Sequence, residues 1–309
     1  MQNINRVLLT GATGFLGKNL MPVLQREHAV VGIGSGLWDL RSQKECQEAI
    51  NSVRPDIIIH AAGSVGGIGA NQENPGKFMY ENLIMGANLI EEARAQGITK
   101  FILLGTVCAY PKHTQVPFKE EDIWLGYPEE TNAPYGIAKK ALMQMLQSYN
   151  QQYGFNGVNL IPVNMYGPHD HFNLTSSHVI PALILKFKNA VMNKEKKVQV
   201  WGTGKASREF LYAPDCAEAI NLAISKEVSP EPINIGTGNE TTIKELVELI
   251  GEIMCFDGEI EFDHSKPDGQ PRRCLDTSRA LDKLGFKAET TLREGLTETI
   301  SWYKESCYV

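Results

Sequence analysis

The chain has 309 residues, of which 42% are hydrophobic and 21% are charged, and its formal net charge is −6. This length suits one large α/β domain or a domain with a second lobe, and the composition excludes a disordered chain. The acidic balance gives no reason to expect a nucleic-acid or anionic-membrane partner. No stretch approaches the roughly 20 apolar residues of a membrane span.

The six cysteines are scattered, without a CxxC pair or a histidine at zinc-ligand spacing. In a chain of this size they indicate reduced thiols rather than a disulfide frame, and they favour no metal site. The first apolar run, Val7 to Thr10, is too short for a signal peptide and is typical of a strand. We therefore expect a cytoplasmic protein without a bound metal.

The first 165 residues alternate short apolar runs with amphipathic segments. Apolar runs bounded by polar residues or glycine predict buried strands, and a 3.6-residue periodicity predicts helices. The alternation predicts an α/β fold with a doubly wound, Rossmann-like parallel sheet. The expected strands are Val7–Thr10, Ala29–Ile33, Ile57–His60, Phe101–Leu104 and Val158–Pro162, and the expected helices are Lys18–Arg26, Gln43–Val53, Tyr80–Gln96 and Tyr135–Tyr153.

Beyond Gly167 the pattern is looser, and no low-complexity linker or internal repeat interrupts it. We expect residues 1–167 to form a dinucleotide-binding domain. Residues 168–309 should form mainly a smaller mixed α/β substrate lobe, packed on the first domain, with some segments returning to it. The expected elements here are helices over Asn173–Ala190, Thr242–Met254 and Leu292–Glu305, and strands over Val198–Trp201 and Ile233–Ile235.

The segment after the first strand carries glycines at three spaced positions, Gly11, Gly14 and Gly17, and opens a helix. The first glycine permits a tight turn, the second lets the backbone approach a pyrophosphate, and the third allows close packing of helix on strand. The free amides of the helix N-terminus can then face the phosphates. We predict a nicotinamide dinucleotide site formed by Gly11, Thr13, Gly14, Phe15, Leu16 and Gly17.

The second strand bears on the choice between NAD and NADP. NAD enzymes usually have an acid at the end of this strand, whereas this chain has glycines and Ser35 there. With no acid to repel a 2′-phosphate, NADP is favoured and NAD is also allowed. Ser35 and Arg41 are candidates to hold that phosphate, and Asp39 with Leu40 is expected beside the adenine.

Tyr135 and Lys139 lie four residues apart, on one face of a predicted helix. An unperturbed tyrosine, with a pKa of about 10, exchanges protons poorly at neutral pH, and a nearby ammonium would lower that pKa. The lysine can also reach a ribose hydroxyl and so orient the nicotinamide. Thr106 follows a strand and is placed to hydrogen-bond a substrate carbonyl. This spacing is common by chance, so its weight comes from Thr106 and the glycine loop.

Longer strings extend the pattern over nearly the whole chain. They are Ala61-Ala62, Val65-Gly66-Gly67-Ile68, Tyr80-Glu81-Asn82-Leu83, the run from Cys108 to Lys112, the run from Glu130 to Tyr135, the run from Ser177 to Leu183, the run from Val200 to Gly204, the run from Arg208 to Leu211, and Ser265-Lys266-Pro267-Asp268-Gly269. Together with the residues above, they resemble the GDP-L-fucose synthase family of the extended short-chain dehydrogenase/reductase superfamily.

The resemblance implies an NADPH-dependent oxidoreductase that reduces the C4 ketone of a GDP-linked 4-keto-6-deoxy sugar, after epimerising the carbons on either side. It implies that Thr106, Tyr135 and Lys139 form the reductase triad, with threonine in place of the usual serine. Cys108 and His178 match the family's epimerase acid/base pair. A C4 ketone acidifies the neighbouring C–H bonds, and a thiol beside a cation ionises readily.

The same resemblance adds Ala61, Ala62 and His178 to the cofactor site, which also includes Tyr135 and Lys139. Without it, Cys108 would be interpreted as a small buried apolar residue and His178 as a helix-start residue. It also implies a homodimer, paired through the two long helices expected at Tyr80–Gln96 and Tyr135–Tyr153.

Substrate contacts are implied in the same way. Trp201 and Arg208 stand where the family holds the guanosine diphosphate, and a guanidinium suits a diphosphate. Lys186 stands where the family usually has arginine, and Lys266 and Asp268 belong to a matching string.

Two further departures concern specificity. Ser64 replaces a lysine of the family, which bears on the sugar. No arginine follows the second strand at residues 33–36, which bears on the preference for NADPH.

Three rival functions stay open. The first is a C4 reductase without epimerase activity, acting on a GDP-4-keto-6-deoxy-heptose. The second is a sugar-nucleotide 4,6-dehydratase, which would typically have Asp-Glu directly after Thr106, where this chain has Val107-Cys108. The third is a non-catalytic dinucleotide sensor, which the presence of Thr106, Tyr135 and Lys139 disfavours.

Overall fold

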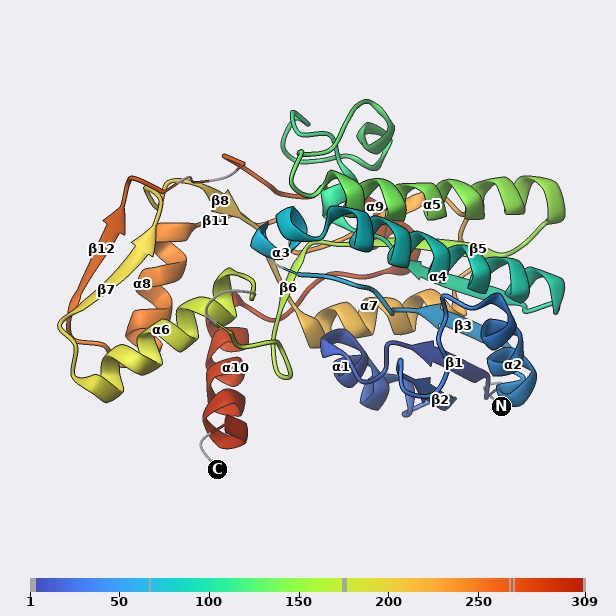
Figure 1. Cartoon of the computed structure of the whole chain (residues 1–309), viewed down its shortest axis with the longest axis horizontal. Coiled ribbons are helices and arrows are strands. Elements are labelled where there is room, and N and C mark those ends of the chain that lie inside the picture. Colours follow the sequence, from blue (N-terminus) through green and yellow to red (C-terminus); the bar gives the residue numbers. More distant parts are fainter. Residues whose placement is uncertain (1–3, 67, 174–176, 267, 269, 308–309) are drawn as a thin grey trace.

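The computed structural model describes residues 4–66, 68–173, 177–266, 268 and 270–307. It has two lobes, a larger one around a six-stranded sheet and a smaller one around α6, α8 and α10 (Figure 1). Among the described residues, no helix combines the length and apolar character needed to cross a membrane. Gly67, Pro267 and Gly269 of the matching strings, and residues 174–176 of the expected helix opening, lie outside the described residues.

The sheet of the larger lobe is parallel throughout, with strand order β10-β5-β4-β3-β1-β2. The predicted doubly wound fold is therefore confirmed. The chain passes from β1 to β2 on one side and then crosses to β3 on the other, so the strand order reverses beside β1. Ligands of such sheets bind at the carboxyl ends of the strands next to this reversal. The strands are β1 (Arg6–Thr10), β2 (Ala29–Ile33), β3 (Ile57–His60), β4 (Lys100–Leu104), β5 (Gly157–Pro162) and β10 (Pro232–Ile235).

Helices cover both faces of this sheet. On one face α2, α4 and α5 contact one another in sequence, and on the other α1, α7 and α9 do so. The short helices α3, η1 and η2 lie in the connections. The bounds are α1 (Phe15–Leu24), α2 (Gln43–Val53), α3 (Ile68–Glu73), α4 (Pro75–Ala95), η1 (Val107–Ala109), η2 (Glu120–Trp124), α5 (Ala133–Tyr153), α7 (Ala213–Ser225) and α9 (Ser278–Leu284).

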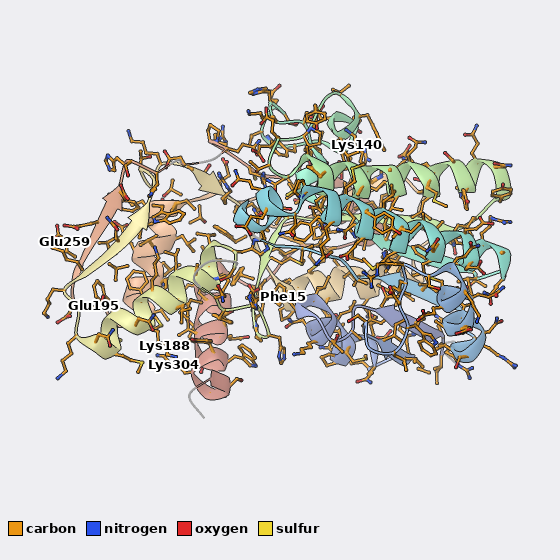
Figure 2. All side chains as sticks on the ribbon, viewed as in Figure 1. Phe15, Lys140, Lys188, Glu195, Glu259 and Lys304 are labelled. Carbon is orange, nitrogen blue, oxygen red and sulfur yellow. The ribbon has the colours of Figure 1, made fainter. Side chains whose placement is uncertain are left out.

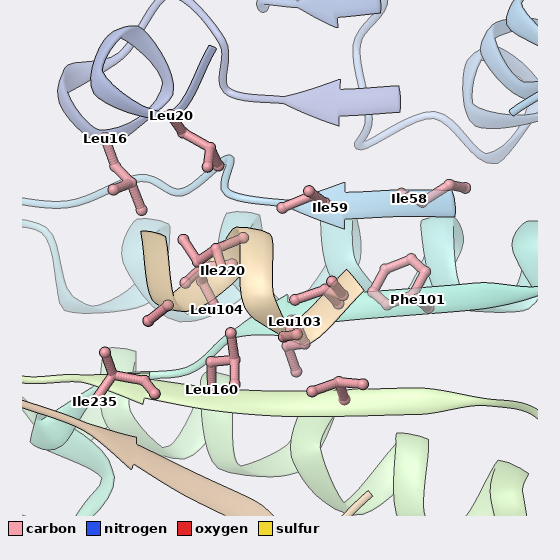
Figure 3. Packing of buried hydrophobic residues seen from close by; sticks show 14 of the residues in the cluster. Leu16, Leu20, Ile58, Ile59, Phe101, Leu103, Leu104, Leu160, Ile220 and Ile235 are labelled. Carbon is pink, nitrogen blue, oxygen red and sulfur yellow. The ribbon is translucent and has the colours of Figure 1, made fainter. Parts of the chain in front are cut away.

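The main core lies between the sheet and these helices. Figure 3 shows Leu16 and Leu20 of α1 and Ile220 of α7 on one side of the central strands. The strands contribute continuous buried runs such as Ile57–Ile59 and Phe101–Leu104, because both of their faces are covered. Full burial of each such aliphatic side chain stabilises the fold by roughly 1.5–3 kcal/mol. This packing fixes the strand ends on which the candidate site stands.

The smaller lobe has a second core, formed by α6, α8 and α10 around buried residues such as Phe187, Leu246 and Ile250. Thr242 caps α8: its hydroxyl accepts from the Glu245 amide, and the Glu245 carboxylate accepts from the Thr242 amide. The elements are β6 (Asn164–Tyr166) paired with β9 (Phe210–Tyr212), β7 (Lys197–Trp201) with β12 (Glu259–Asp263), β8 (Ser207–Arg208) with β11 (Thr241–Thr242), α6 (Val179–Asn193), α8 (Ile243–Ile253) and α10 (Leu292–Cys307).

Several helix bounds differ from the expected ones. Helix α1 begins at Phe15 rather than Lys18, because Gly14 is itself the N-cap. Helix α4 begins at Pro75, where proline suits the first turn, and α6 begins at Val179. Helix α7 was not expected at all. Its alanine-rich, buried residues give little periodic contrast, and with β10 it returns to the larger lobe.

Candidate active site

The glycine loop joins β1 to α1 at the reversal of the strand order. Gly11 has a φ of +71°, and a Cβ there would lie 2.7 Å from the amide nitrogen of Ala62. A Cβ on Gly17 would collide with the Gly11 carbonyl oxygen, to which the Gly14 amide donates at 3.0 Å. No side chain caps α1, so its first-turn amides are left for a ligand. These features fit the diphosphate of a dinucleotide.

The other loop residues lie around this turn. Thr13 contacts the end of β2, since a Cβ on Gly34 would lie 2.7 Å from the Thr13 hydroxyl oxygen. Leu16 is buried in the core, and Phe15 is labelled in Figure 2 at the start of α1, on the side that faces the smaller lobe. The loop is thus fixed by packing against β2 and β3.

Ala61 and Ala62 follow β3 and form the wall behind the glycine loop. The Ala62 amide donates to the Thr10 hydroxyl oxygen at 3.2 Å, and that hydroxyl is hydrogen-bonded to Nδ1 of His60 at 2.9 Å. His60 is fully buried, and its Nε2 has no hydrogen-bond partner in the described structure. Burial, helped by the nearby charge of Lys139, lowers the pKa of His60 to about 3. The imidazole is therefore neutral at physiological pH.

The candidate 2′-phosphate residues follow β2. Ser35 is exposed, whereas Arg41 is ion-paired with Asp39 at 2.7 Å and with Glu81 at 3.1 Å. The Arg41 guanidinium lowers the pKa of the Asp39 carboxyl. Leu40 is buried, and its carbonyl accepts from the Asn88 side chain at 3.2 Å. The charge of Arg41 is therefore already balanced. Of the two candidate residues for a 2′-phosphate, Ser35 is the one whose side chain has no partner among the described residues.

Thr106, Tyr135 and Lys139 meet beyond the end of β4. Thr106 is the N-cap of η1, where its hydroxyl oxygen accepts from the Cys108 amide at 3.2 Å, and it is hydrogen-bonded to Tyr135. Lys139 lies one helical turn after Tyr135 on α5 and is only 3% exposed. Burial lowers the pKa of Lys139 to about 8. A Cβ on Gly136 would collide with the Cys108 carbonyl oxygen, so α5 packs directly on η1.

The pKa of Tyr135 differs from the sequence-based expectation. Burial raises this pKa above its ordinary value, the neighbouring Cys108 adds to the rise, and the hydrogen bond with Thr106 offsets it only in part. The expected lowering of this pKa by Lys139 is absent, and desolvation of the phenolate is the largest cause of the rise. Tyr135 is therefore protonated at neutral pH, which is the state that a proton donor to a ketone oxygen requires.

Cys108 and His178 come from different lobes. Cys108 lies half-buried in η1, with the Arg273 guanidinium nitrogen Nη1 3.9 Å from its sulfur. His178 is the N-cap residue of α6 and is exposed, and desolvation by the surrounding protein lowers its pKa. No hydrogen bond joins Cys108 to His178 in the described structure. The structure thus brings Cys108 to Tyr135, whereas among the described residues no hydrogen bond joins His178 to either.

Trp201 lies at the end of β7 and is 64% exposed. The ammonium groups of Lys186 and Lys266 lie 5.8 and 5.5 Å from the centroid of its ring. The Lys186 ammonium also donates to the Gln199 carbonyl at 3.0 Å. These three residues form an exposed aromatic and cationic surface, which suits a base and its attached phosphates.

Arg208 lies on β8, and no carboxylate in the described part of the chain is hydrogen-bonded to it. Its guanidinium donates to the carbonyls of Ser207 at 2.7 Å and Asp268 at 3.4 Å. Burial and then the charge of Arg273 lower the pKa of Arg208 to about 10. The Asp268 carboxylate accepts from the amide and hydroxyl of Thr203, at 2.6 and 2.7 Å, and therefore holds a turn. Of Arg208 and Asp268, Arg208 is therefore the residue suited to an anionic ligand.

Two features of the site have no counterpart in the sequence-based prediction. Arg273 contacts Cys108 from 165 residues away, and nothing in its local run of charged residues distinguishes it from Arg272. Ser64, the departure from the family lysine, is held by Asn82, whose amide nitrogen donates to the Ser64 carbonyl at 2.8 Å. Such pairings depend on the tertiary fold, so no spacing rule could have found them.

Comparison with known proteins gives consistent matches. Residues 7–236 match the model of the NAD dependent epimerase/dehydratase family. A GDP-L-fucose synthase of Sinorhizobium fredii is 39% identical over 295 residues, which cover 95% of this chain and 94% of that protein.

Two solved structures extend the likeness to the fold. A GDP-L-fucose synthetase from Naegleria fowleri has a TM-score of 0.92 at 28% identity, covering 100% of this chain and 96% of that one. A GDP-mannoheptose C4 reductase from Campylobacter jejuni, solved with NADP bound, has a TM-score of 0.88 at 29% identity and covers 98% of this chain and 99% of that one. The resemblance found in the sequence strings is confirmed.

Proposed function

The chain belongs to the NAD dependent epimerase/dehydratase family, and on that premise we propose that it is an NADPH-dependent oxidoreductase that reduces the C4 ketone of a GDP-linked 4-keto-6-deoxy sugar. The observation that carries the proposal is the contact of Thr106, Tyr135 and Cys108 beyond β4, in the same lobe as the glycine cradle. The relatives named above support it, since they are a GDP-L-fucose synthase and a GDP-sugar C4 reductase.

When bound, the nicotinamide supplies a hydride to the C4 carbon. The protein's part is to hold the ketone and to supply a proton. The Thr106 hydroxyl, whose oxygen accepts from the Cys108 amide, would turn from Tyr135 and donate to the C4 oxygen when the substrate is bound. Tyr135 is protonated at neutral pH and gives its proton to that oxygen. Lys139, one turn further along α5, would orient the nicotinamide by reaching a ribose hydroxyl.

For the cofactor we propose the glycine loop and the wall at Ala61-Ala62 as the holder of the diphosphate. NADPH is the favoured form, in keeping with the NADP bound to the Campylobacter jejuni reductase. The ion pairs of Arg41 leave Ser35 and backbone groups to meet the 2′-phosphate. Discrimination against NADH should therefore be modest.

We also propose that reduction follows epimerisation at C3 and C5. The Cys108 thiolate takes a proton from the carbon beside C4, and the C–H electron pair passes to an enolate whose charge rests on the C4 oxygen. His178 passes a proton from water to the same carbon on the opposite face, and exchange with water restores both groups. In this proposal His178 acts from the start of α6, in the smaller lobe.

The two lobes divide these tasks in our proposal. Residues 1–167, together with α7, β10 and α9, hold the cofactor and the reductase residues. The remainder, with Lys186, Trp201, Arg208 and Lys266, holds the GDP moiety. We further propose a cytoplasmic homodimer that pairs through α4 and α5, which lie side by side on one face of the sheet.

A heptose substrate is the second candidate, because a solved neighbour is named as a GDP-mannoheptose C4 reductase. The test is to supply NADPH with GDP-4-keto-6-deoxy-mannose and, separately, with the corresponding GDP-4-keto-6-deoxy-heptose. Consumption of NADPH with the hexose and formation of GDP-L-fucose would support the leading proposal. Consumption with the heptose alone would favour the second candidate, and no consumption with either would overturn both.

A further inference from the structure

A cationic side chain that has no part in the reductase chemistry lies beside Cys108. The Nη1 atom of Arg273 is 3.9 Å from the Cys108 sulfur, although the two residues are far apart in sequence. Both side chains are half-buried, so water screens the interaction only in part. A guanidinium this close to a sulfur atom is the kind of neighbour that favours a thiolate.

The hydrogen bonds of Arg273 orient its guanidinium without neutralising it. Its Nε and Nη2 both donate to the side-chain oxygen of Gln270, at 3.2 and 2.9 Å. That amide oxygen carries no net charge. No carboxylate of the described residues lies within ion-pair distance of Arg273, so its positive charge is available to an anion.

The adjacent arginine behaves differently and shows that the arrangement is specific. Arg272 is bound to the Glu240 carboxylate, to which its Nε donates at 3.1 Å, so its charge is already paired. The backbone between them is fixed, since Ser207 donates to the Pro271 carbonyl at 2.9 Å and Glu209 to the Arg273 carbonyl at 3.1 Å. One arginine thus stabilises the lobe, and the next is presented to the thiol.

We infer that Arg273 is a positioning residue that stabilises the thiolate form of Cys108. Its role in catalysis rests on the epimerase step proposed above, where that thiolate removes the proton beside C4. Arg208 lies close enough to Arg273 for that charge to contribute, after burial, to the lowering of the Arg208 pKa, while Asp268 acts in the opposite direction. Arg208 suits the diphosphate, and Arg273 suits the sulfur.

The test measures the thiol directly and does not require turnover. Cys108 in the full-length protein is alkylated with uncharged iodoacetamide across a range of pH, and its rate is followed by peptide mass spectrometry. Exposed Cys255 in the same molecule is the internal reference. In Arg273→Gln, alkylation of Cys108 should slow about tenfold at neutral pH relative to Cys255 and recover at alkaline pH.

Two matched variants separate charge from folding. Arg273→Lys keeps the charge and should retain most of the wild-type rate, and Arg272→Gln should leave the Cys108 profile unchanged. An unchanged profile in Arg273→Gln, or an equal loss in Arg272→Gln, would overturn the inference. The alkylation rate does not depend on the sugar, so failure of the proposed reduction would leave the alkylation result standing. Deuterium uptake at C3 or C5 in Arg273→Gln is a separate measurement, and it reports whether the thiolate serves epimerisation.

Discussion

In the larger lobe, Lys139 is 3% exposed and Tyr135 lies on a helix that packs directly on η1, whereas in the smaller lobe Trp201 is 64% exposed between two lysine side chains. The first arrangement is set by backbone, and small displacements there would produce collisions. The second is set by long side chains that can move. This scaffold therefore fixes its chemistry in the sheet-based lobe and leaves substrate choice to a more adaptable surface.

The largest effect is expected at the proton donor. Tyr135→Phe removes the phenolic proton while keeping the ring, so the rate of C4 reduction should fall about a thousandfold. The thermal unfolding temperature should hardly change, because the ring still fills the same space. Steady-state oxidation of NADPH measures the rate. A variant that reduces substrate as fast as wild type would show that the buried region is a scaffold rather than the reductase centre.

The next effect concerns Lys139. Its pKa of about 8 predicts that the reduction rate of the wild type falls as pH rises through that value and the ammonium is lost. Lys139→Met should reduce the rate about a hundredfold and remove this alkaline limb. The measurement is the pH profile of kcat/KM for both proteins. An identical limb in Lys139→Met would assign the titration to another group.

A stability effect should mark the buried region as well. The pKa of His60 is lowered from 6.5 to about 3, so its neutral form contributes stability that is complete above pH 6.5 and is lost as pH falls towards 3. Between pH 7 and pH 5 this residue should lower the free energy of unfolding by about 2 kcal/mol. Urea unfolding of wild type and His60→Asn at the two pH values measures this loss, since only the wild type should lose this part of the free energy of unfolding. Equal pH dependence in the two proteins would argue against a desolvated imidazole.

A smaller effect is expected on the exposed surface. Trp201→Ala should raise KM for the GDP-sugar about tenfold, with kcat little changed, because stacking contributes to binding and not to the chemistry. Trp201→Phe keeps an aromatic face and is the matched control, with most of the affinity retained. A fall in kcat with KM unchanged would mean that the smaller lobe also positions the reacting carbons.

The smallest effect is expected at Arg41. Because its guanidinium is paired with Asp39 and Glu81 on the surface, Arg41→Ala should change the preference for NADPH over NADH by less than about threefold. Kinetics with each cofactor give this ratio. A selective tenfold loss with NADPH would show instead that Arg41 leaves its carboxylates to bind the 2′-phosphate.

The sequence could predict the features that depend on local patterns, but not those that depend on tertiary neighbours. The parallel sheet, the glycine loop and the Tyr135/Lys139 helix depend on local periodicity and short spacings, and the strand ends agree with expectation within about a residue. Helix α7 escaped prediction because it is buried on more than one side. The raised pKa of Tyr135 and the contact of Arg273 with Cys108 depend on burial and on tertiary neighbours, which no local pattern encodes.

The central claim is that one site carries two separable chemistries, and Tyr135→Phe in deuterated water tests it most directly. With GDP-4-keto-6-deoxy-mannose and NADPH, this variant should incorporate deuterium at C3 and C5 while oxidising almost no NADPH, because Cys108 and His178 remain intact. A companion Cys108→Ser variant should lose the deuterium uptake. Reduction by Tyr135→Phe at the wild-type rate, or the absence of deuterium in both Tyr135→Phe and the wild type, would contradict the account.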